Sequence, residues 1–506
     1  MKSAKSASDE KMDAPRIFRR NNIQETAALP GDFCIALDHD AVIAGDGSTI
    51  RGGSPARLLR LTSAGGNILN AIARGDTVAE IERMQRGAGV LIRRLINAGL
   101  AHPVPPETPS EKWVQVVIPV RNRPDHLREL VAWLHPRAAP VVVDDASDDD
   151  TAAVARALGC AVVALERRRG PSSARNAGWR ATDAPLVAFI DSDCRPGPGT
   201  LDRLAAHFDD PNVGAAAPRI RPKSDGRDGS VQRYESCRSS EDLGPWPALV
   251  RPASKVAYVP TVLLVVRRAA LMEIEGFDEG MSLGEDVDFV WRLIAARWDV
   301  RYDPTVRAVH DHRRSLAPFL LRKFAYGSAA GALERRHRGW VASPRVPLLD
   351  FAAWLLCVAW PFWTPVVLAL LASAYLLESK SPRPGPNWRG ALRRVLVNGG
   401  DLADAIVRTW LPLGVAASLF FPRFGVLLAA GALYSCLLER RRRRCRLDPL
   451  RYVAIRLLDD ASYGLGVWWG CLRHGSVAPL IPKLALPWRR VIGAAMPTDE
   501  EMHKDA

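Results

Sequence analysis

The sequence predicts a protein of the α/β class, with a small separate domain before the α/β domain and an apolar helical region after it. Short apolar runs alternate with helical patterns between residues 113 and 335, which is the signal of βαβ units and a parallel sheet. Residues 29–103 have a pattern of their own, and long apolar stretches dominate residues 346–488. Residues 1–27 are polar, lack the apolar core of a signal peptide, and are expected to be a disordered tail.

Polar side chains stand where the predicted strands of the α/β domain end and where its helices begin. These positions matter because open parallel sheets bind their ligands outside the carboxyl ends of the strands. The residues found there are, in chain order, Pro119 and Arg121, Asp144 and Asp145, Arg175 and Asn176, Asp191 and Asp193, Glu285 and Asp286, and His310 and His312. The sequence therefore places a candidate ligand site at this edge of the sheet.

The segment VAFIDSDCR (187–195) is an apolar strand that runs into Asp191-Ser192-Asp193. Two carboxylates one residue apart suit a hard divalent cation on a diphosphate, because Mg²⁺ and Mn²⁺ prefer oxygen ligands and usually keep one or two carboxylates beside phosphate oxygens. Aspartate is also common at strand ends simply because turns favour it. The other motifs of the domain decide between these interpretations.

Five ordered motifs resemble the nucleotide-sugar-dependent glycosyltransferases of family 2, which have the Rossmann-like GT-A fold. The family pattern is a strand with P-x-x-N/R, a strand ending in DD-x-S, a helix with G-x-x-x-A-R-N, a D-x-D and a downstream E-D, and all occur here in that order. The sequence of residues 54–61, 284–293 and 301–315 is similar to that of the glycosyltransferases of mycofactocin biosynthesis. That resemblance covers most of the chain.

The resemblance implies a UDP-sugar donor. Asp145 would accept a hydrogen bond from the uracil imide, since a carboxylate is an acceptor only. Asp144 beside it is more simply explained as a turn residue at the strand end. The guanidinium of Arg175 would neutralise part of the nucleotide charge, and Asp191 would orient the ribose or the water ligands of the metal. The other donor-binding candidates are Pro119, Arg121 and Asn176.

The resemblance also implies a metal ion and a general base. Asp193 would bind Mg²⁺ or Mn²⁺, which would stabilise the departing diphosphate. His310 and His312 would complete the metal shell or contact the pyrophosphate. Asp286 would take the proton of the acceptor hydroxyl in a single inverting displacement, with Glu285 as the alternative base. Both acids also suit a helix start for stability alone, because the helix dipole favours carboxylates there.

The sequence departs from the family pattern in two places. Long-chain polymerising members carry Q-x-x-R-W after the base, whereas residues 320–336 read LLRKFAYGSAAGALERR. One sugar or a short oligosaccharide is therefore the expected product. The second strand reads DDAS where DDGS is common, so Ala146 replaces a glycine. Alanine tolerates that turn less well if its φ is positive.

Residues 29–103 show short strands around the Asp46-Gly47 turn and then three helical patterns, which is a winged-helix outline. Winged helices often bind DNA. The pattern here instead resembles the PqqD-like peptide-recognition domains of ribosomal-peptide pathways, which bind a leader peptide as an added strand. We therefore favour a leader peptide or a pathway protein as partner, and no nucleic acid. The linker VPPETPSEK (104–112) follows.

Residues 346–377 and 411–438 are apolar stretches, each broken near its middle by proline. The unbroken limbs are shorter than the roughly 20 residues that a spanning helix needs, and basic residues flank both stretches. Positive loops stay in the cytoplasm. Two membrane-embedded hairpins at the cytoplasmic face of the cell membrane are therefore favoured over two kinked spans or a buried helical domain.

Composition agrees with an anionic partner. The 506 residues carry a formal net charge of +14, and the 8 cysteines include no C-x-x-C, so neither a zinc site nor a disulfide framework is expected. By the resemblance, the chain would add β-linked glucose to premycofactocin, a peptide-derived redox cofactor precursor. The alternatives are a membrane glycosyltransferase acting on lipid or cell-wall polysaccharide, and a winged-helix regulator fused to an inactive transferase fold.

Overall fold

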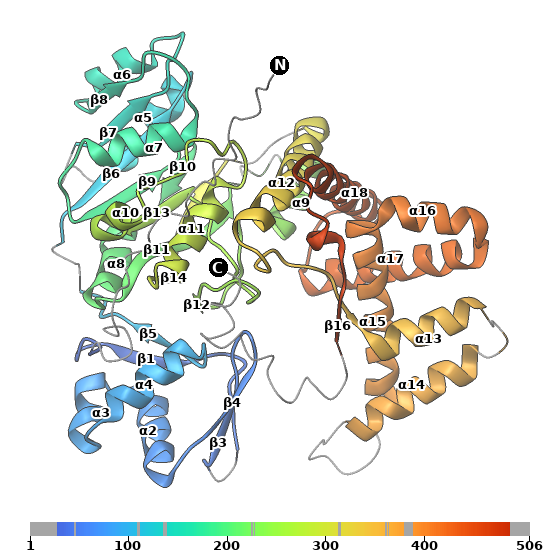
Figure 1. Ribbon diagram of the computed structural model, residues 1–506. Coiled ribbons are helices and arrows are strands. Elements are labelled where there is room, and N and C mark those ends of the chain that lie inside the picture. Colours follow the sequence, from blue (N-terminus) through green and yellow to red (C-terminus); the bar gives the residue numbers. More distant parts are fainter. Residues whose placement is uncertain are drawn as a thin grey trace, which may run out of the picture.

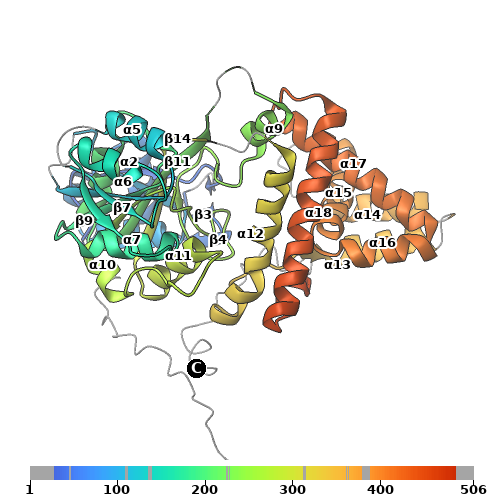
Figure 2. The ribbon, with the colours of Figure 1, turned by 90° about the horizontal axis from the view of Figure 1, so that it is seen from above.

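The computed structural model describes residues 28–485 apart from 45–46, 109–111, 135–138, 224–225, 227, 312–314, 360–361, 363 and 379–387. The predicted tail, residues 1–27, lies outside the described residues. The chain forms an N-terminal domain, a central α/β domain and a C-terminal helical region (Figure 1). Helices α12 (Leu316–Arg336) and α18 (Pro449–His474) lie side by side between the α/β domain and the other C-terminal helices (Figure 2).

The N-terminal domain combines three helices with two small antiparallel sheets. Its elements are β1 (Cys34–Leu37), β2 (Val42–Ile43), β3 (Thr49–Gly52), β4 (Arg57–Arg60), α2 (Ser63–Arg74), α3 (Val78–Met84), α4 (Ala88–Asn97) and β5 (Ala101–Val104). Strand β1 pairs with β5, and β2, β3 and β4 form the second sheet. The predicted number and order of the helices are confirmed, while the winged-helix assignment stays a prediction.

A buried ion pair fixes the N-terminal domain to the α/β domain. Arg93 of α4 donates two hydrogen bonds to Asp210, with Nη1–Oδ2 and Nη2–Oδ1 distances of 2.7 and 3.1 Å. Both side chains are buried. Planar, two-point contacts of this kind set orientation as well as distance. The N-terminal domain is therefore held in a defined position on the α/β domain.

The α/β domain is built on one mixed sheet. Its strands are β6 (Val114–Val120), β7 (Val141–Asp144), β8 (Ala161–Ala164), β9 (Leu186–Ile190), β10 (Cys194–Pro196), β11 (Val213–Pro222), β12 (Ala248–Leu249), β13 (Leu263–Arg267) and β14 (Asp299–His310). The order is β10-β14-β11-β13-β9-β6-β7-β8, with β12 paired to β14. Strands β6 to β9 are parallel, as predicted, whereas β13 and β10 run antiparallel to their neighbours.

Helices cover both faces of this sheet. They are α5 (Pro124–Trp133), α6 (Thr151–Ala157), α7 (Pro171–Arg180), α8 (Thr200–Ala206), α10 (Arg268–Glu273) and α11 (Glu285–Ala295), while α9 (Ser230–Arg238) and α12 lie beside α18 (Figure 2). Alternate residues of each strand point to opposite faces, so Val117 packs in one core and Ile118 in the other. Gly178 lets α7 lie close to the sheet, because a Cβ there would collide with Val117. This contact sets the position of the predicted site residues on α7.

Both apolar stretches of the C-terminal region fold back on themselves. The elements are β15 (Arg345–Pro347), α13 (Leu348–Ala359), α14 (Thr364–Glu378), α15 (Trp388–Thr409), α16 (Leu411–Phe420), α17 (Pro422–Arg442), α18 and β16 (Lys483–Ala485). Helices α13 and α14 contact each other, as do α16 and α17. The second break falls at Pro422, as predicted, because proline starts a helix more readily than it continues one.

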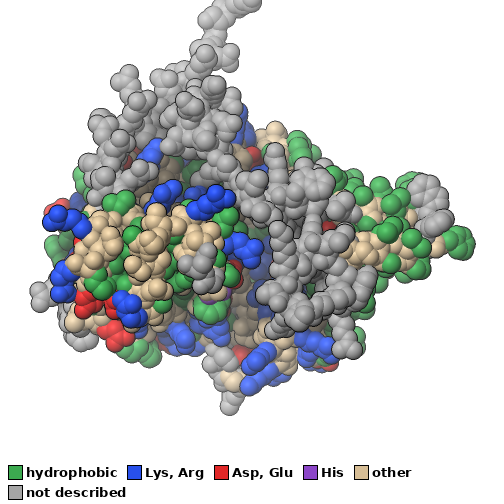
Figure 3. Space-filling model, turned by 90° about the horizontal axis from the view of Figure 1, so that it is seen from below, with side chains coloured by type: hydrophobic (Ala, Val, Ile, Leu, Met, Phe, Trp, Pro, Cys, Tyr) green, Lys and Arg blue, Asp and Glu red, His purple; other side chains and the backbone are tan. Residues whose placement is uncertain are grey.

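The far end of the C-terminal region is covered by apolar side chains (Figure 3). Phe362 follows α13, Phe420 ends α16, and Phe421 separates α16 from α17; their exposed fractions are 95%, 80% and 62%. In the described part of the chain, no helix alone has the length and apolar character to cross a bilayer. One pair, Val395–Thr409 with Leu411–Phe420, meets those criteria jointly but bends by 109°.

Helices α12 and α18 touch through glycines. A Cβ on Gly466 would collide with the carbonyl oxygen of Phe324, and one on Gly327 with that of Tyr463. The two backbones are therefore in direct contact, which side chains would normally prevent. This contact ties the last long helix of the chain to a helix of the α/β domain.

Gly466→Ala should destabilise the protein by about 2 kcal/mol, because the added methyl group forces two packed backbones apart. In an exposed helix the same change stabilises by about 1 kcal/mol, so the sign of the effect is the test. Gly89→Ala is the matched control, since a Cβ there meets only the Glu82 carboxylate at 3.6 Å. Thermal unfolding followed by circular dichroism measures both variants. An unchanged or raised midpoint for Gly466→Ala would contradict the packing.

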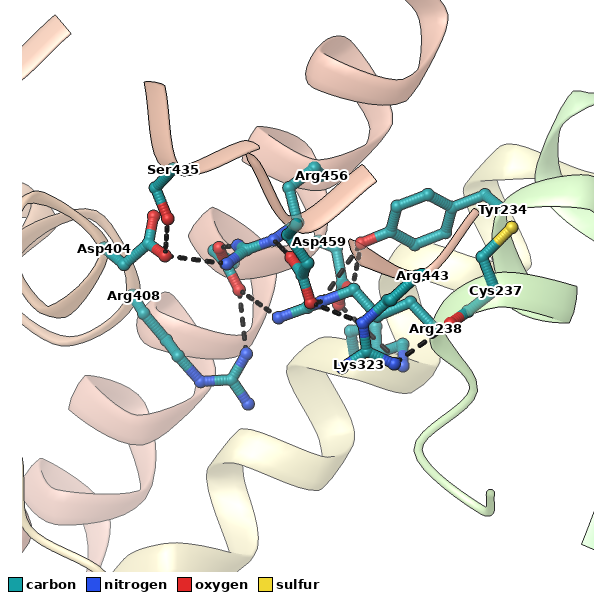
Figure 4. A network of polar contacts seen from close by, with 12 residues as sticks. Tyr234, Cys237, Arg238, Lys323, Asp404, Arg408, Ser435, Arg443, Arg456 and Asp459 are labelled. Carbon is teal, nitrogen blue, oxygen red and sulfur yellow. Dashed lines mark hydrogen bonds and ion pairs between the residues drawn. The ribbon is translucent and has the colours of Figure 1, made fainter. Parts of the chain in front are cut away.

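A buried polar network joins the α/β domain to the C-terminal helices (Figure 4). Asp459 of α18 accepts hydrogen bonds from Arg238 Nη1 (2.6 Å) and the Tyr234 hydroxyl (2.9 Å), both on α9. Lys323 of α12 lies 3.9 Å from the same carboxylate. Arg456, also on α18, continues the network to α15 and α17. Buried charges are costly unless paired, so this arrangement holds α9 and α12 against α18.

The sequence analysis expected no disulfide framework, and this expectation is wrong. Cys237, at the end of α9, and Cys445, just before α18, form a disulfide with a Cα–Cα distance of 5.5 Å. The two residues are 208 positions apart, so their spacing gave no signal. The bond joins α9 to the segment between α17 and α18 and therefore reinforces the same interface.

Candidate active site

The predicted donor residues at β6 and β7 hold the loops around them. Asp145 accepts hydrogen bonds from the backbone N–H groups of Arg169 and Gly170 at 2.6 and 2.9 Å. Asp144 accepts from the backbone N–H and the hydroxyl of Ser147, which is the turn role foreseen for it. A carboxylate has about four acceptor positions, so Asp145 retains capacity for a base N–H. Its contact with uracil stays a prediction.

The first strand ends beside this loop. Pro119 lies in β6 opposite Val143 of β7. Arg121 donates from Nε to the Ala146 carbonyl at 3.3 Å and from Nη2 to Asp148 at 3.2 Å. Ala146 has a φ of +53°, so the residue stands in the left-handed region where glycine is favoured. The Ala-for-Gly departure in the DDAS motif therefore falls at a position that does have positive φ.

Arg175 links the D-x-D segment to the start of α11. Its Nη2 donates to Asp191 Oδ1 at 2.8 Å, and its Nη1 lies 3.7 Å from Glu285 Oε1. The guanidinium is buried, with 4% of the side chain exposed. Burial raises the pKa of the Asp191 carboxyl, while the charge of Arg175 opposes that rise. The sequence analysis predicted that Arg175 neutralises part of the nucleotide charge. In the structure Arg175 lies between the carboxylates of Asp191 and Glu285 and holds them in position.

Asn176 has a structural role that its motif did not predict. Its Nδ2 donates to the Phe277 carbonyl at 2.8 Å and to Glu279 at 3.0 Å, and its Oδ1 accepts from Phe277 N and Trp179 Nε1. The amide is buried and both of its ends are engaged. These bonds fix the loop that precedes α11. A nucleotide contact by Asn176 is not favoured by them.

The second carboxylate of the D-x-D is the centre of a short polar chain. Asp193 Oδ1 lies 3.1 Å from His310 Nε2, and its Oδ2 accepts from Arg123 Nη1 at 2.6 Å. His310 Nδ1 lies 2.8 Å from Glu241 Oε2. Burial alone would lower the pKa of His310, but the carboxylates of Glu241 and Asp193 raise it to about 10. Burial is likewise outweighed at Asp193, whose pKa is held below its usual value by His310 and Arg123.

Asp193 and His310 fit a divalent cation. His310 Nε2 and Asp193 Oδ1 lie 3.1 Å apart, within hydrogen-bond distance and close enough that both would be ligands of one cation. One oxygen and one imidazole nitrogen suit Mn²⁺ better than Mg²⁺. A proton shared by these two groups would leave as the metal binds. His312, the other predicted ligand, lies outside the described residues.

Asp286 has the properties of a general base. It lies in the first turn of α11, after Gly284, and its Oδ1 accepts from the backbone N–H of Val287 at 2.8 Å. Burial and the charge of the neighbouring Glu285 raise the pKa of Asp286 to about 7. A base is most effective when its pKa lies near the working pH. The helix start predicted at Glu285 is confirmed, and the catalytic role of Asp286 stays a prediction.

Three residues of the site were missed by the sequence analysis. Arg123, two residues beyond Arg121 in the same turn, could have been included as a second cation at a strand end. Glu241 stands in the loop segment SSEDLG, which carries no recognisable pattern. Arg322 of α12 lies 3.7 Å from Glu241 and therefore borders the site. It belongs to residues 320–336, where polymerising members of the family carry Q-x-x-R-W.

Comparison with known proteins assigns the chain to a family. The glycosyl transferase family 2 model matches residues 115–274, which include every strand end of the nucleotide side and the D-x-D. The pre-mycofactocin glycosyltransferase of Mycobacterium tuberculosis is 35% identical over 485 residues, which are 90% of this chain and 98% of that protein. Glycosyltransferase AglE of Haloferax volcanii is 24% identical over 231 residues, 44% of this chain and 73% of AglE.

Among solved structures, a mannosyltransferase of Pyrobaculum calidifontis in complex with GDP-Man and Mn²⁺ is 20% identical and aligns over 65% of this chain and 89% of its own, with a TM-score of 0.35. The mycobacterial relative matches in all three parts of the chain, because the alignment spans nearly its full length. The chain therefore belongs to glycosyl transferase family 2, with its GT-A fold, and within it to the family of the pre-mycofactocin glycosyltransferases.

Proposed function

We propose that the chain transfers glucose from UDP-glucose to premycofactocin and forms a β-linkage by a single inverting displacement. The observation that carries this proposal is the contact of the D-x-D segment with the start of α11. Arg175 bridges Asp191 of the D-x-D to Glu285, and Glu285 directly precedes Asp286. A candidate leaving-group site and a candidate base are thereby held on one rigid set of contacts, as a displacement between a bound donor and an entering hydroxyl requires.

The chain's own groups support the donor half of this reaction. Arg123 places positive charge beside Asp193, where a diphosphate would lie. Mg²⁺ or Mn²⁺ held by Asp193 and His310 would supply Lewis-acid stabilisation to the departing UDP. Asp145 and Arg121 stand at the ends of the two strands farther along the sheet, where the uridine would bind.

The acceptor half depends on Asp286. The acceptor oxygen forms a bond to the anomeric carbon while the bond from that carbon to the phosphate oxygen breaks. Asp286 takes the hydroxyl proton, and UDP leaves with the electron pair. Because attack comes from the face opposite UDP, an α-linked donor gives a β-linked product. The pKa of about 7 means that Asp286 can both accept this proton and return it to water.

A mass-spectrometric acceptor assay tests this function. Purified protein with UDP-glucose and Mn²⁺ is offered a premycofactocin extract and, separately, a lipid extract. We expect one or a few hexose units on the cofactor precursor. Hexose on lipid alone would keep the fold and the mechanism but assign the enzyme to the envelope, which is the second candidate function that the exposed apolar helices favour. No transfer to either would reject both.

We also propose that the exposed ends of the two C-terminal hairpins enter the cytoplasmic leaflet of the cell membrane. Phe420 is the last residue of α16, and its 80% exposure would be unfavourable in water. Phe420→Glu should lower the fraction of protein that floats with vesicles of phosphatidylcholine and phosphatidylglycerol. Leu450→Glu is the matched control, because Leu450 is 81% exposed but lies beyond the other end of α17. Equal flotation of both variants would reject this orientation.

The N-terminal domain is proposed to receive a leader peptide or a pathway protein by strand addition. Strand β4 stands at one edge of the small sheet, beside β3 alone, and Leu58 on it is 49% exposed. An open edge offers backbone hydrogen bonds to an extended peptide. The docking of this domain through Arg93 and Asp210 would then bring a bound peptide to the enzyme in a fixed position.

A further inference from the structure

Asp288 is a fully buried carboxylate that lies on α11, two residues beyond Asp286. Burial alone would raise the pKa of Asp288, but a hydrogen bond from His337 and the charges of Arg292 and Arg336 hold it below its usual value. The side chain is therefore charged within the core, where a charge is costly unless it is paired. The proposed mechanism gives this carboxylate no chemical step, so its partners show what it does.

The partners of Asp288 come from two helices. Arg292, one turn later on α11, donates from Nε to Oδ2 at 2.8 Å. His337 and Arg336, at the end of α12, lie against Oδ1, with Nε2 at 2.8 Å and Nε at 3.0 Å. Arg292 alone would neutralise the carboxylate from within α11. The two contacts from α12 are additional, and they tie the first turns of α11 to the end of α12.

His337 is the more rigid of the two contacts from α12. Its side chain is 10% exposed, whereas that of Arg336 is 41% exposed. The imidazole stacks on the ring of Trp340 with centroids 5.6 Å apart and lies nearly perpendicular to the ring of Trp291 at 5.3 Å. These rings restrict the imidazole to one orientation. Because a carboxylate only accepts hydrogen bonds, His337 donates from Nε2 to Asp288.

The residue before α11 also contacts α12. Gly284 has a φ of +74°, and a Cβ there would lie 2.9 Å from the Cβ of Ala329 on α12. Helix α11 therefore touches α12 at Gly284 and again at Asp288. Asp286 lies between these two points, so its position follows the placement of α11 on α12.

We propose that His337, acting through Asp288, is a positioning residue for the base Asp286. Its hydrogen bond fixes the rotation and the axial position of α11 relative to α12, and these set where the Asp286 carboxylate meets the acceptor hydroxyl. A displacement of about 1 Å at such a position can lower a rate about 10²-fold. The inference rests on the proposed sugar transfer with Asp286 as its base, and it adds a residue that acts on that base from another helix.

The contact of His337 with Asp288 extends to the base a series of contacts that begins in the C-terminal region. Helix α12 is in backbone contact with α18, because a Cβ on Gly331 would collide with the carbonyl oxygen of Gly470. Such close packing leaves α12 little room to shift, so its end is a firm point of attachment for α11. The C-terminal region thereby takes part in placing the base.

Hydrogen exchange of α11 tests this role without turnover. His337→Leu keeps an apolar side chain of similar size but removes the donor. The backbone N–H groups of residues 288–290 should then exchange about tenfold faster or more, the effect of losing a hydrogen bond to a charged group. His337→Gln, whose amide N–H can replace Nε2–H, should restore protection. His207→Leu is the matched control, because His207 Nε2 lies 3.0 Å from Asp303 in another buried pair, and it should leave α11 protected.

The rate of glucose transfer supplies the functional measurement. In His337→Leu, kcat should fall about tenfold to 10²-fold, while the Kd of UDP-glucose with Mn²⁺ stays at the wild-type value, because the contacts proposed for the donor lie on other elements. His337→Gln should recover most of the lost kcat. His207→Leu should turn over like the wild type.

Three results would overturn the proposal. The first is wild-type exchange of residues 288–290 in His337→Leu. The second is an equal loss of kcat in His207→Leu, which would make the effect a general loss of stability. The third is a loss of donor affinity in place of kcat, which would assign His337 to the donor side. Failure of the premycofactocin assay would reject the proposed function but leave the exchange results standing, so the two failures are distinguishable.

Discussion

Asp286→Asn should lower the kcat of glucose transfer by about 10²–10⁴-fold, the usual contribution of a positioned general base. Asparagine keeps the size of the side chain and can still accept the hydrogen bond from Val287 N. It cannot take a proton. Donor binding should stay near that of the wild type, because the contacts proposed for UDP lie on other strands. Initial rates by mass spectrometry and the Kd of UDP-glucose by calorimetry measure the two quantities separately.

Glu285→Gln is the matched control for this experiment. Glu285 stands beside Asp286 on α11 and lies near Arg175, so its amide variant makes the same chemical change one residue away. We expect a smaller loss of kcat. Wild-type turnover by Asp286→Asn would remove it as the base, and a larger loss for Glu285→Gln would transfer the role to Glu285.

The pH dependence of kcat gives a second, independent signature. Burial and the charge of Glu285 raise the pKa of Asp286 to about 7, so the carboxylate form that accepts the proton is lost as the pH falls through 7. Below that value kcat should fall by about tenfold per pH unit, and above it kcat should be level. The acidic limb should disappear in Asp286→Asn. A level profile in the wild type down to pH 5 would argue against Asp286 as the base.

Asp193→Ala should abolish the dependence of donor binding on metal ions. The variant loses the only described carboxylate that contacts His310 Nε2, and removal of a direct ligand should cost more than the roughly 10–100-fold seen for groups that merely support ligands. Titration of UDP-glucose with and without Mn²⁺ is the measurement. The wild type should bind far more tightly with Mn²⁺, and the variant should bind weakly in both conditions.

Asp311→Asn provides the comparison for Asp193→Ala. Asp311 follows His310 directly, but its carboxylate lies 3.5 Å from Lys223 Nζ rather than against the histidine. Its variant should keep the response to Mn²⁺. If Asp193→Ala responded to Mn²⁺ like the wild type, the metal site would have to lie elsewhere.

The parts of this protein that could be predicted from the sequence are those fixed by local signals. Strand ends, the Gly-Pro start of α7 and the acidic start of α11 each depend on a few neighbouring residues, and the structure has all three. The motif around Asn176 shows the limit of this approach. The sequence of this motif matches the family. The side-chain amide of Asn176, however, is hydrogen-bonded to Phe277, about 100 residues later, which no local pattern could reveal.

What could not be predicted depends on contacts across long stretches of chain. Glu241 meets His310 about 70 residues later, and it follows α9, which is bonded to Asp459 more than 200 residues downstream. The disulfide between Cys237 and Cys445 belongs to the same interface. The apolar stretches predicted a membrane role for the C-terminal region. Nothing in their composition indicated that this region also holds α9 and α12 of the α/β domain in place.

The contact between α12 and α18 sets an order of events during synthesis. Helix α12 is complete at Arg336, but its partner ends only at His474, so the glycine-lined pair cannot form until most of the chain has left the ribosome. Both hairpins emerge in that interval, and domains generally fold from the N-terminus onward. The hairpins that we propose to enter the membrane are therefore synthesised before α12 and α18 can pair. Membrane entry during synthesis would then precede the pairing of α12 with α18 rather than follow it.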